Sequence, residues 1–444
     1  MSATVAGDSA PGIGLRARFR HGITWNVVNA VFTQGSVFLS NVLVANLLGR
    51  EIFGEYGMIQ STLITLSSVA QVATGVTATK YLAEFRSTDK EKTGRILGLC
   101  STVTFLTGCV ATLLLLAGAP WLASHTLRAP HLARGIMISA GFVMFSVING
   151  YQAGALAGLE GYRVLARAGV FQGVLHLLVV ALGAWFRGLE GALAGLVASS
   201  VARWILYHRA LRTVGQEQGI FLTYKGLWRE RRIILGFAVP AALSGLTSMP
   251  ALWLANAFLV RQEGGFSQMG LYSAAVTLRA LVLFLPGLFN NVGMSLLNNE
   301  KGLGNETGYR KIFWFNLAAT SGIAAAGAAI VSVTGPWLLK GFGKEFAAGS
   351  GVLLILMLST LPEIVAVASA QIVQSREKLW LSLFLIAIPR DLSMVALAYY
   401  LTPLYGAAGL AWAYTISWTL TMVIVFLLVR SLGLDPRGDD MRTA

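Results

Sequence analysis

Long uncharged apolar runs recur along the whole 444-residue chain and alternate with short polar segments. A run of about 20 such residues is long enough to cross the bilayer core as a helix. The runs that meet this criterion span residues 23–48, 58–78, 96–123, 136–157, 168–186, 192–208, 233–260, 271–297, 312–338, 352–373, 379–401 and 407–428. The pattern predicts an all-α integral membrane protein with about twelve transmembrane helices.

The composition agrees with this prediction. Hydrophobic residues make up 55% of the chain and charged residues only 12%, whereas soluble proteins carry about 25% charged residues. This excludes an ordinary cytosolic enzyme or a disordered chain, and twelve spans leave no room for a soluble catalytic domain. The net charge of +14 could indicate nucleic-acid binding, but in a membrane protein the positive-inside rule explains it more simply, and we expect no nucleic-acid partner.

The positions of Lys and Arg predict the orientation of the chain in the membrane. With the N-terminus inside, 24 of them fall in cytoplasmic segments and 7 in outer segments. Because cytoplasmic loops carry the excess of positive charge, both termini are predicted to be cytoplasmic. The three remaining residues, Arg203, Arg279 and Arg390, lie inside predicted spans.

Two short motifs repeat at nearly the same spacing. Gly54-Glu-Tyr56-Gly57 at the start of span two matches Gly270-Leu-Tyr272-Ser273 at the start of span eight, and 191–196 resembles 406–410. Duplicated halves are common in transporters. We therefore expect two six-helix lobes in parallel orientation, with boundaries at 1–212 and 232–444.

The segment between the lobes, 213–231, is predicted to lie at the cytoplasmic membrane surface. Phe221, Tyr224 and Trp228 recur at three- and four-residue spacing among basic residues. This pattern favours an interfacial helix that contacts anionic membrane lipids. A plain linker is the alternative.

The motifs also resemble those of a known family. The stretch Leu47-Leu-Gly-Arg-Glu-Ile-Phe-Gly-Glu-Tyr-Gly57 is followed by Ala78-Thr-Lys-Tyr-Leu-Ala-Glu-Phe-Arg86, by Gly158-Leu-Glu-Gly-Tyr162 and by Gly270-Leu-Tyr-Ser-Ala-Ala275. In order and spacing they resemble Wzx-type polysaccharide (O-antigen) flippases of the multidrug/oligosaccharidyl-lipid/polysaccharide exporter superfamily. The resemblance implies a V-shaped pair of six-helix bundles around a central cavity, which moves a lipid-diphosphate-linked glycan between leaflets by alternating access.

The glycines of the first motif have a simpler structural interpretation. Gly54 and Gly57 flank Tyr56 and suit a tight reversal between two helices at the membrane surface. We expect the Tyr56 ring to lie among the lipid headgroups and the turn to make no substrate contact.

Charged residues inside the spans are candidates for function, because each costs about 2.5 to 3.5 kcal/mol at the bilayer centre. We expect Arg279 and Arg390 to face a cavity and bind the diphosphate or an acidic sugar of the cargo. Neighbours on a helix diverge by about 100°, so Arg390 and Asp391 are predicted not to neutralise each other. The alternative is a structural ion pair, Arg390 with Glu363 or Arg279 with Asp391. The two carboxylates are also candidates for coupling-ion binding.

A third arginine, Arg203, is predicted near the cytoplasmic end of span six. It either contributes to a cationic cavity or extends to the membrane surface.

Amide side chains are the candidates for sugar contacts. They comprise Asn26, Asn29, Gln34, Asn41, Asn46, Gln60 and Gln71 in the first lobe, and Asn290 and Asn291 in the second. Each could bond sugar hydroxyls in a cavity or, alternatively, a neighbouring helix.

Prolines concentrate in the second lobe and predict bent or locally unwound helices. They are Pro240 and Pro250 in span seven, Pro286 in span eight, Pro362 in span ten and Pro389 in span eleven. Such breaks are tolerated only beside a cavity or other protein. We expect these helices to deform during transport, with static kinks as the alternative.

No motif predicts an enzyme, a cofactor or a metal site. A phosphate-binding Gly-rich loop with Lys and Ser/Thr is absent, and the five His and the pair Cys100 and Cys109 lack metal-ligand spacing. The sequence therefore predicts a secondary-active flippase of the bacterial inner membrane, coupled to H⁺, Na⁺ or the membrane potential. A polysaccharide polymerase or glycosyltransferase would be its protein partner. A multidrug or cation antiporter and a non-transporting scaffold of a polysaccharide synthesis complex are the alternatives.

Overall fold

The computed structural model describes residues 15–233, 247–376 and 379–431, and the side chains of residues 30–233, 247–376 and 380–431. These parts of the chain form helices and contain no strand. The first half comprises α1 (Leu15–Ala70), α2 (Thr74–Phe85), α3 (Lys90–Trp121), α4 (Ala133–Ser139), α5 (Gly141–Gly158) and α6 (Tyr162–Gln218). The second comprises α7 (Arg231–Ile233), α9 (Ser248–Val260), α10 (Gly265–Gly302), α11 (Glu306–Lys340), α12 (Ser350–Ser375), α13 (Leu379–Ser382) and α14 (Ile388–Ser431).

The helices account for twelve membrane crossings. Within the described residues, 8 helical stretches are long and apolar enough to span a bilayer. Three of them contain a break and cross twice, at Gly49, at Arg187–Gly188 and at Gly406. The shorter apolar helix Ser248–Val260 is the described part of the predicted span 233–260 beyond residue 247, and with it the helices agree with about twelve spans.

The first of these breaks corrects the prediction for the repeated glycines. The chain reverses at Gly49, with φ 77° and ψ 175°, a conformation that glycine adopts without the steric cost of a Cβ. Gly54 and Gly57 therefore lie inside a helix, and Tyr56 is buried with 1% exposure instead of lying among the headgroups.

The breaks at Gly188 and Gly406 show that the two halves share local geometry. Gly188 has φ 58° and ψ −137°, and Gly406 has φ 55° and ψ −130°. In each half a second glycine follows three residues after the break and allows a close backbone approach. A Cβ on Gly191 would lie 1.9 Å from the Gly183 oxygen, and a Cβ on Gly409 would lie 2.1 Å from the Leu401 oxygen. Gly191 is therefore the counterpart of Gly409, and the repeat predicted from the sequence is shifted by three residues here.

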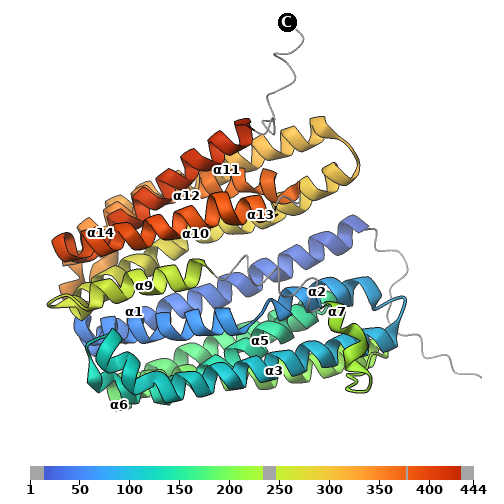
Figure 1. Cartoon of the computed structure of the whole chain (residues 1–444), viewed down its shortest axis with the longest axis horizontal. Coiled ribbons are helices and arrows are strands. Elements are labelled where there is room, and N and C mark those ends of the chain that lie inside the picture. The colour runs from blue at the N-terminus through green and yellow to red at the C-terminus, as the bar shows by residue number, and fades with distance from the viewer. Residues whose placement is uncertain (1–14, 234–246, 377–378, 432–444) are drawn as a thin grey trace, which may run out of the picture.

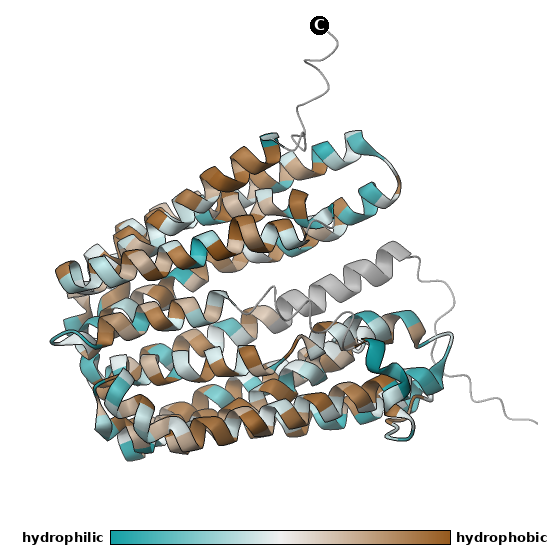
Figure 2. Cartoon of the chain, in the orientation of Figure 1, coloured by the Kyte–Doolittle hydropathy of each residue, from teal (hydrophilic) through white to brown (hydrophobic). Residues whose placement is uncertain are grey.

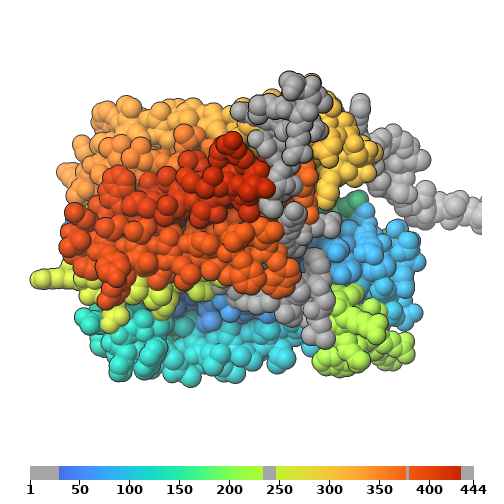
Figure 3. All heavy atoms as spheres, turned by 45° about the horizontal axis from the view of Figure 1, so that its top comes forward, coloured from blue at the N-terminus to red at the C-terminus, as the bar shows by residue number. Residues whose placement is uncertain are grey.

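The two halves form two lobes that diverge from one end of the molecule (Figure 1). The lobes meet at the end that contains the breaks at Gly49, Gly188 and Gly406, which we call the Gly49 end. Apolar residues line the middle of the helices and hydrophilic residues gather at the turns (Figure 2). The space-filling view shows α14 of the second lobe stacked over the first lobe, with α9 visible along the seam (Figure 3). The predicted V-shaped arrangement of two helical lobes is confirmed.

The segment that leads out of the first lobe is not an interfacial helix. Helix α6 continues to Gln218 and ends at Gly219, where φ is 67°. The chain then packs along the start of α3, where Thr223 N donates to Gly94 O over 3.2 Å and Arg95 Nε bonds Glu230 Oε1 over 3.1 Å. The three aromatic residues predicted to reach lipid, Phe221, Tyr224 and Trp228, are exposed, and only Leu227–Glu230 is helical, as one 3-10 turn.

Candidate functional site

The repeated glycine motifs form the crossing between the lobes. A Cβ on Gly54 would lie 1.8 Å from Phe266 O and 2.8 Å from Gly270 N, and one on Gly270 would lie 2.0 Å from Arg50 O. The contact is reciprocal, because Arg50 and Phe266 each precede the glycine of their own helix by four residues. Small residues allow such close backbone approach between membrane helices. The motif that was predicted to form a turn thus forms a close backbone contact between α1 and α10.

Polar and aromatic contacts reinforce this end of the molecule. Arg50 N donates to Glu345 Oε1 over 2.7 Å, and Phe53 packs against Phe342 and Phe346. The hydrogen bonds between lobes among the described residues all use residues 41–65 of α1, including Trp253 Nε1 to Thr62 Oγ1 at 2.9 Å. The lobes are therefore joined from the Gly49 end to Thr65, about 24 Å along α1 at 1.5 Å per residue.

Three adjoining cavities extend from this junction into the second lobe, and we call them the cavity row. The first, of about 420 Å³, lies between the lobes, and its polar lining includes Gln34, Asn41, Gln60, Asn256, Arg279 and Tyr414. The second, of about 190 Å³, shares Tyr414 with the first and is lined by Ser248, Arg390, Asp391 and Trp418. The third, of about 520 Å³, shares Ser248, Arg390 and Trp418 with the second and adds Asn290, Asn291 and Gln371.

Arg279 of α10 is a buried cation that lines the first cavity, and it is only 8% exposed. It forms an ion pair with Glu363 of α12, its Nε donates to Ser359 Oγ over 3.2 Å, and its Nη2 donates to Tyr414 Oη over 3.0 Å. The Tyr414 hydroxyl in turn donates to Glu363 Oε2 over 3.3 Å. Side chains of two helices, α12 and α14, therefore hold the guanidinium, and the carboxylate of Glu363 neutralises it.

Arg390 of α14 is neutralised by its own neighbour, which corrects the sequence prediction. Arg390 Nε bonds Asp391 Oδ1 over 2.9 Å. Ser248 Oγ of α9 accepts from Arg390 Nη2 and donates to Asp391 Oδ2 over 3.2 Å. The Cβ atoms of adjacent residues do diverge, but the arginine side chain is long enough to fold back and reach the carboxylate.

The partners of the two arginines differ from both predicted ion pairs. The structure pairs Arg279 with Glu363 and Arg390 with Asp391. Each guanidinium also lies over an aromatic ring of α14, Arg279 at 4.4 Å from Tyr414 and Arg390 at 4.8 Å from Trp418. The two rings are one helical turn apart, so α14 aligns both cations along the cavity row.

Arg203 does not reach the membrane surface. Helix α6 continues fifteen residues beyond it to Gln218, about 22 Å at 1.5 Å per residue, whereas the prediction ended the span near residue 208. Its Nη2 donates to Gln172 Oε1 over 2.7 Å, and its Nε is buried without a partner among the described residues. Arg203 thus lies inside the first lobe and lines none of the three cavities of the row.

The predicted amides divide into two groups. Asn290 connects helices, because Asn316 Nδ2 donates to its Oδ1 over 3.0 Å and Gln371 Nε2 to its carbonyl over 2.9 Å. Asn291 lines the third cavity and is exposed. The side chains of Asn26 and Asn29 lie outside the described residues.

Most of the described prolines lie in regular helix. Pro250 is in the first turn of α9, where its missing N–H removes no helical hydrogen bond, and α10 and α12 continue through Pro286 and Pro362. Pro389 follows a π-helical turn, Leu383–Ala387. Pro240 lies outside the described residues.

Comparison with known proteins gives the family. Residues 19–295 match the family model described as polysaccharide biosynthesis protein. The chain belongs to this family. It is 23% identical over 320 residues to the EPS I polysaccharide export inner membrane protein EpsE of Ralstonia solanacearum, which covers 67% of each chain. It is 28% identical over 169 residues to the stage V sporulation protein B of Bacillus subtilis (strain 168), covering 37% of this chain and 33% of the relative.

Solved structures of one superfamily share the fold of this family member. An inward-facing MATE family multidrug resistance transporter of the MOP superfamily superposes with a TM-score of 0.75, at 15% identity, over 93% of this chain and 98% of its own. A MOP superfamily transporter from Pyrococcus furiosus superposes with a TM-score of 0.69, at 17% identity, over 93% and 95%. The resemblance drawn from the sequence motifs is confirmed.

Several residues of the site were not predicted from the sequence. Ser248, Ser359, Tyr414 and Trp418 hold the two arginines, yet each resembles an ordinary residue of a membrane helix. The four-residue spacing of Tyr414 and Trp418 places both rings on one face of α14. That spacing, read together with the two arginines inside the spans, was the available clue.

Proposed function

We propose that this family member is a secondary-active flippase that moves a lipid-diphosphate-linked oligosaccharide from the cytoplasmic to the outer leaflet of the bacterial inner membrane. The family description, the name of the Ralstonia relative and the transporter fold support a polysaccharide export role. The charge distribution supports cytoplasmic termini. In this orientation the Gly49 end faces outward, so the lobes are closed on the outside and diverge on the cytoplasmic side.

The observation that carries the proposal is the position of Arg279 and Arg390 on the cavity row. The hydrogen bonds and ion pairs that the two guanidinium groups form with described residues involve only their Nε and Nη2 atoms. In the described structure this leaves each Nη1 available for a further acceptor. Guanidinium groups bind phosphate oxygens strongly and with defined geometry. The diphosphate would approach these Nη1 groups, while Asn291, Gln34 and Gln60 would contact sugars.

The carboxylates supply a means of coupling. Glu363 and Asp391 hold the arginines when the cavity is empty, and a diphosphate would compete with them for the same cations. Binding of H⁺ or Na⁺ to a displaced carboxylate would lower the cost of separating it from its arginine. Cargo and coupling ion would therefore bind cooperatively.

A liposome assay tests the transport proposal. We expect wild-type protein to move a fluorescent polyprenyl-diphosphate oligosaccharide to the opposite leaflet, and Arg390→Ala to reduce the rate at least about tenfold, because a charge-assisted contact contributes about 1.5 to 3 kcal/mol. The matched control is Arg261→Ala, an exposed arginine outside the cavity row.

The assay also distinguishes the alternatives. Efflux of a cationic dye without glycolipid movement would assign the protein to the antiporters. No transport of either compound by folded protein would favour a scaffold that recruits a polymerase or glycosyltransferase. Equal flipping by Arg390→Ala and Arg261→Ala would remove the arginine from the mechanism.

A further inference from the structure

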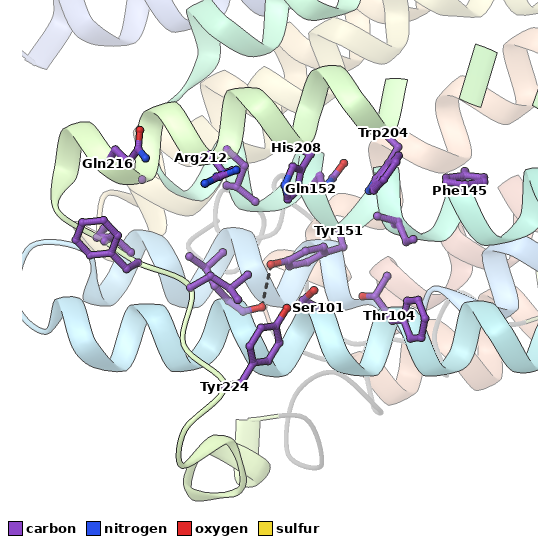
Figure 4. Close-up of a pocket in the computed structure, with 18 of the residues that line it drawn as sticks. Ser101, Thr104, Phe145, Tyr151, Gln152, Trp204, His208, Arg212, Gln216 and Tyr224 are labelled. Carbon is purple, nitrogen blue, oxygen red and sulfur yellow. Dashed lines mark hydrogen bonds between the residues drawn. The ribbon is translucent and has the colours of Figure 1, made fainter. Parts of the chain in front are cut away.

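A second large cavity lies in the first lobe, apart from the cavity row. Its volume is about 700 Å³, within the roughly 300 to 1,000 Å³ typical of small-molecule sites. Helices α3, α5 and α6 form its walls, and the segment 220–224 that leads out of the lobe crosses one end (Figure 4). None of its lining residues takes part in the proposed transport site.

The cavity is apolar at one end and polar at the other. Phe145 and Trp204 lie at the apolar end, whereas Arg212, Gln216 and Tyr224 lie at the other (Figure 4). Trp204 and Arg212 are eight residues apart on α6, about 12 Å along the helix. A ligand that fills the cavity therefore has an apolar part at one end and a polar part at the other.

The cavity opens on the outside of the helix bundle. Phe105 of α3, at the apolar end, is 58% exposed, and Leu222 of the crossing segment is 43% exposed. Both residues line the cavity, and Phe105 belongs to a predicted transmembrane span. An apolar opening within a span faces lipid chains and not water.

An unsatisfied polar group lies in the wall of the cavity. Gln152 of α5 is 3% exposed, and its Oε1 has no hydrogen-bond partner among the described residues. A buried polar atom without a partner is costly, which points to a missing ligand or water. Because the two ends of an amide are interchangeable by rotation, this side chain can also donate to a carbonyl oxygen.

The charge of the polar end selects an anion. Arg212 and His208 line it, and none of the described lining residues is a carboxylate. Arg212 forms no ion pair with any other described residue. Basic pockets between membrane helices at the cytoplasmic surface bind anionic lipid headgroups.

We propose that this cavity binds one anionic phospholipid. An acyl chain lies between Phe105, Phe145 and Trp204, an ester carbonyl accepts from the amide of Gln152, and the phosphate contacts Arg212. Because segment 220–224 forms part of the wall, the lipid fastens the start of the inter-lobe connection to α3 and α6. The site is independent of the proposed flippase activity.

Native mass spectrometry with defined lipids tests this site. The protein would be delipidated and titrated with phosphatidylglycerol or with phosphatidylcholine of the same chains. We expect wild type to retain phosphatidylglycerol preferentially, and Arg212→Ala to weaken that binding about fivefold, the effect of removing one basic contact. Arg209→Ala is the matched control, since Arg209 is exposed on the same helix and does not line the cavity.

A second variant fills the middle of the cavity, where Ser101 lies near Tyr151 and Tyr224 (Figure 4). Ser101→Trp places a large side chain in the cavity and should abolish binding of both lipids, with an unchanged melting temperature as the folding control. If this variant does not fold, the comparison of Arg212→Ala with Arg209→Ala decides alone. Equal retention of the two lipids by wild type would show that the cavity does not select an anion, and equal loss in the two arginine variants would reduce the effect to general surface electrostatics. Either result would overturn the proposal.

Discussion

Replacing Arg279 with alanine is expected to destabilise the protein by roughly 3 kcal/mol, because it leaves the buried carboxylate of Glu363 without its cation. Arg279 and Glu363 side chains are only 9% and 15% exposed, so hydration replaces the lost partner only in small part. The loss should appear as a lower Tm of the purified protein. Arg261→Ala, at an exposed position, should stay within about 0.5 kcal/mol of wild type.

The double variant separates stability from transport. Arg279→Ala with Glu363→Ala removes both charges and should recover much of the Tm, since a buried ion pair contributes little net stability over uncharged side chains. Transport of the glycolipid should stay low in the same variant, because the cation that would bind the diphosphate is gone. Recovery of both properties together would show that the pair is only structural.

The approximate number of spans was predictable because the bilayer imposes a strict rule on the chain. A span needs about 20 apolar residues whose backbone groups form hydrogen bonds within the helix. Runs such as 271–297 can therefore be recognised as spans from the sequence alone. The break between spans five and six was placed correctly near Gly188, where a glycine, an arginine and a glutamate interrupt an apolar run.

Side-chain partners were not predictable in the same way. Sequence spacing gives the direction of each Cβ, but Arg390 reaches Asp391 through rotations along its own long side chain. The choice of Glu363 as partner of Arg279 depends on how α10, α12 and α14 pack, which no local pattern encodes.

Glycines were ambiguous for a related reason. A glycine permits a reversal through positive φ or a close helix crossing through its missing Cβ. Gly49 serves the first purpose and Gly54 the second, only five residues apart. The repeated motif marked the right residues, but their function depended on which helix of the other lobe they meet.

Gly54→Ala is expected to open the contact between the lobes at the Gly49 end. The new Cβ would lie 1.8 Å from Phe266 O, whereas real Cβ atoms essentially never come within 3.0 Å of such a neighbour. Because both neighbours are backbone atoms, the helices must separate by more than an ångström. In the proposed flippase cycle this contact must form and break, so we expect glycolipid transport to fall at least about tenfold as the closed state loses population.

Distance measurements between spin labels can follow this change directly. Labels at Arg128→Cys and Glu263→Cys, both exposed near the Gly49 end, with Cys100 and Cys109 replaced by alanine, should report a longer distance in Gly54→Ala and in Gly270→Ala. Gly35→Ala and Gly287→Ala are the matched controls on the same two helices, since a Cβ at either position meets nothing within 4 Å. An unchanged distance in Gly54→Ala, or the same shift in Gly35→Ala, would show that the glycine crossing does not hold the lobes together.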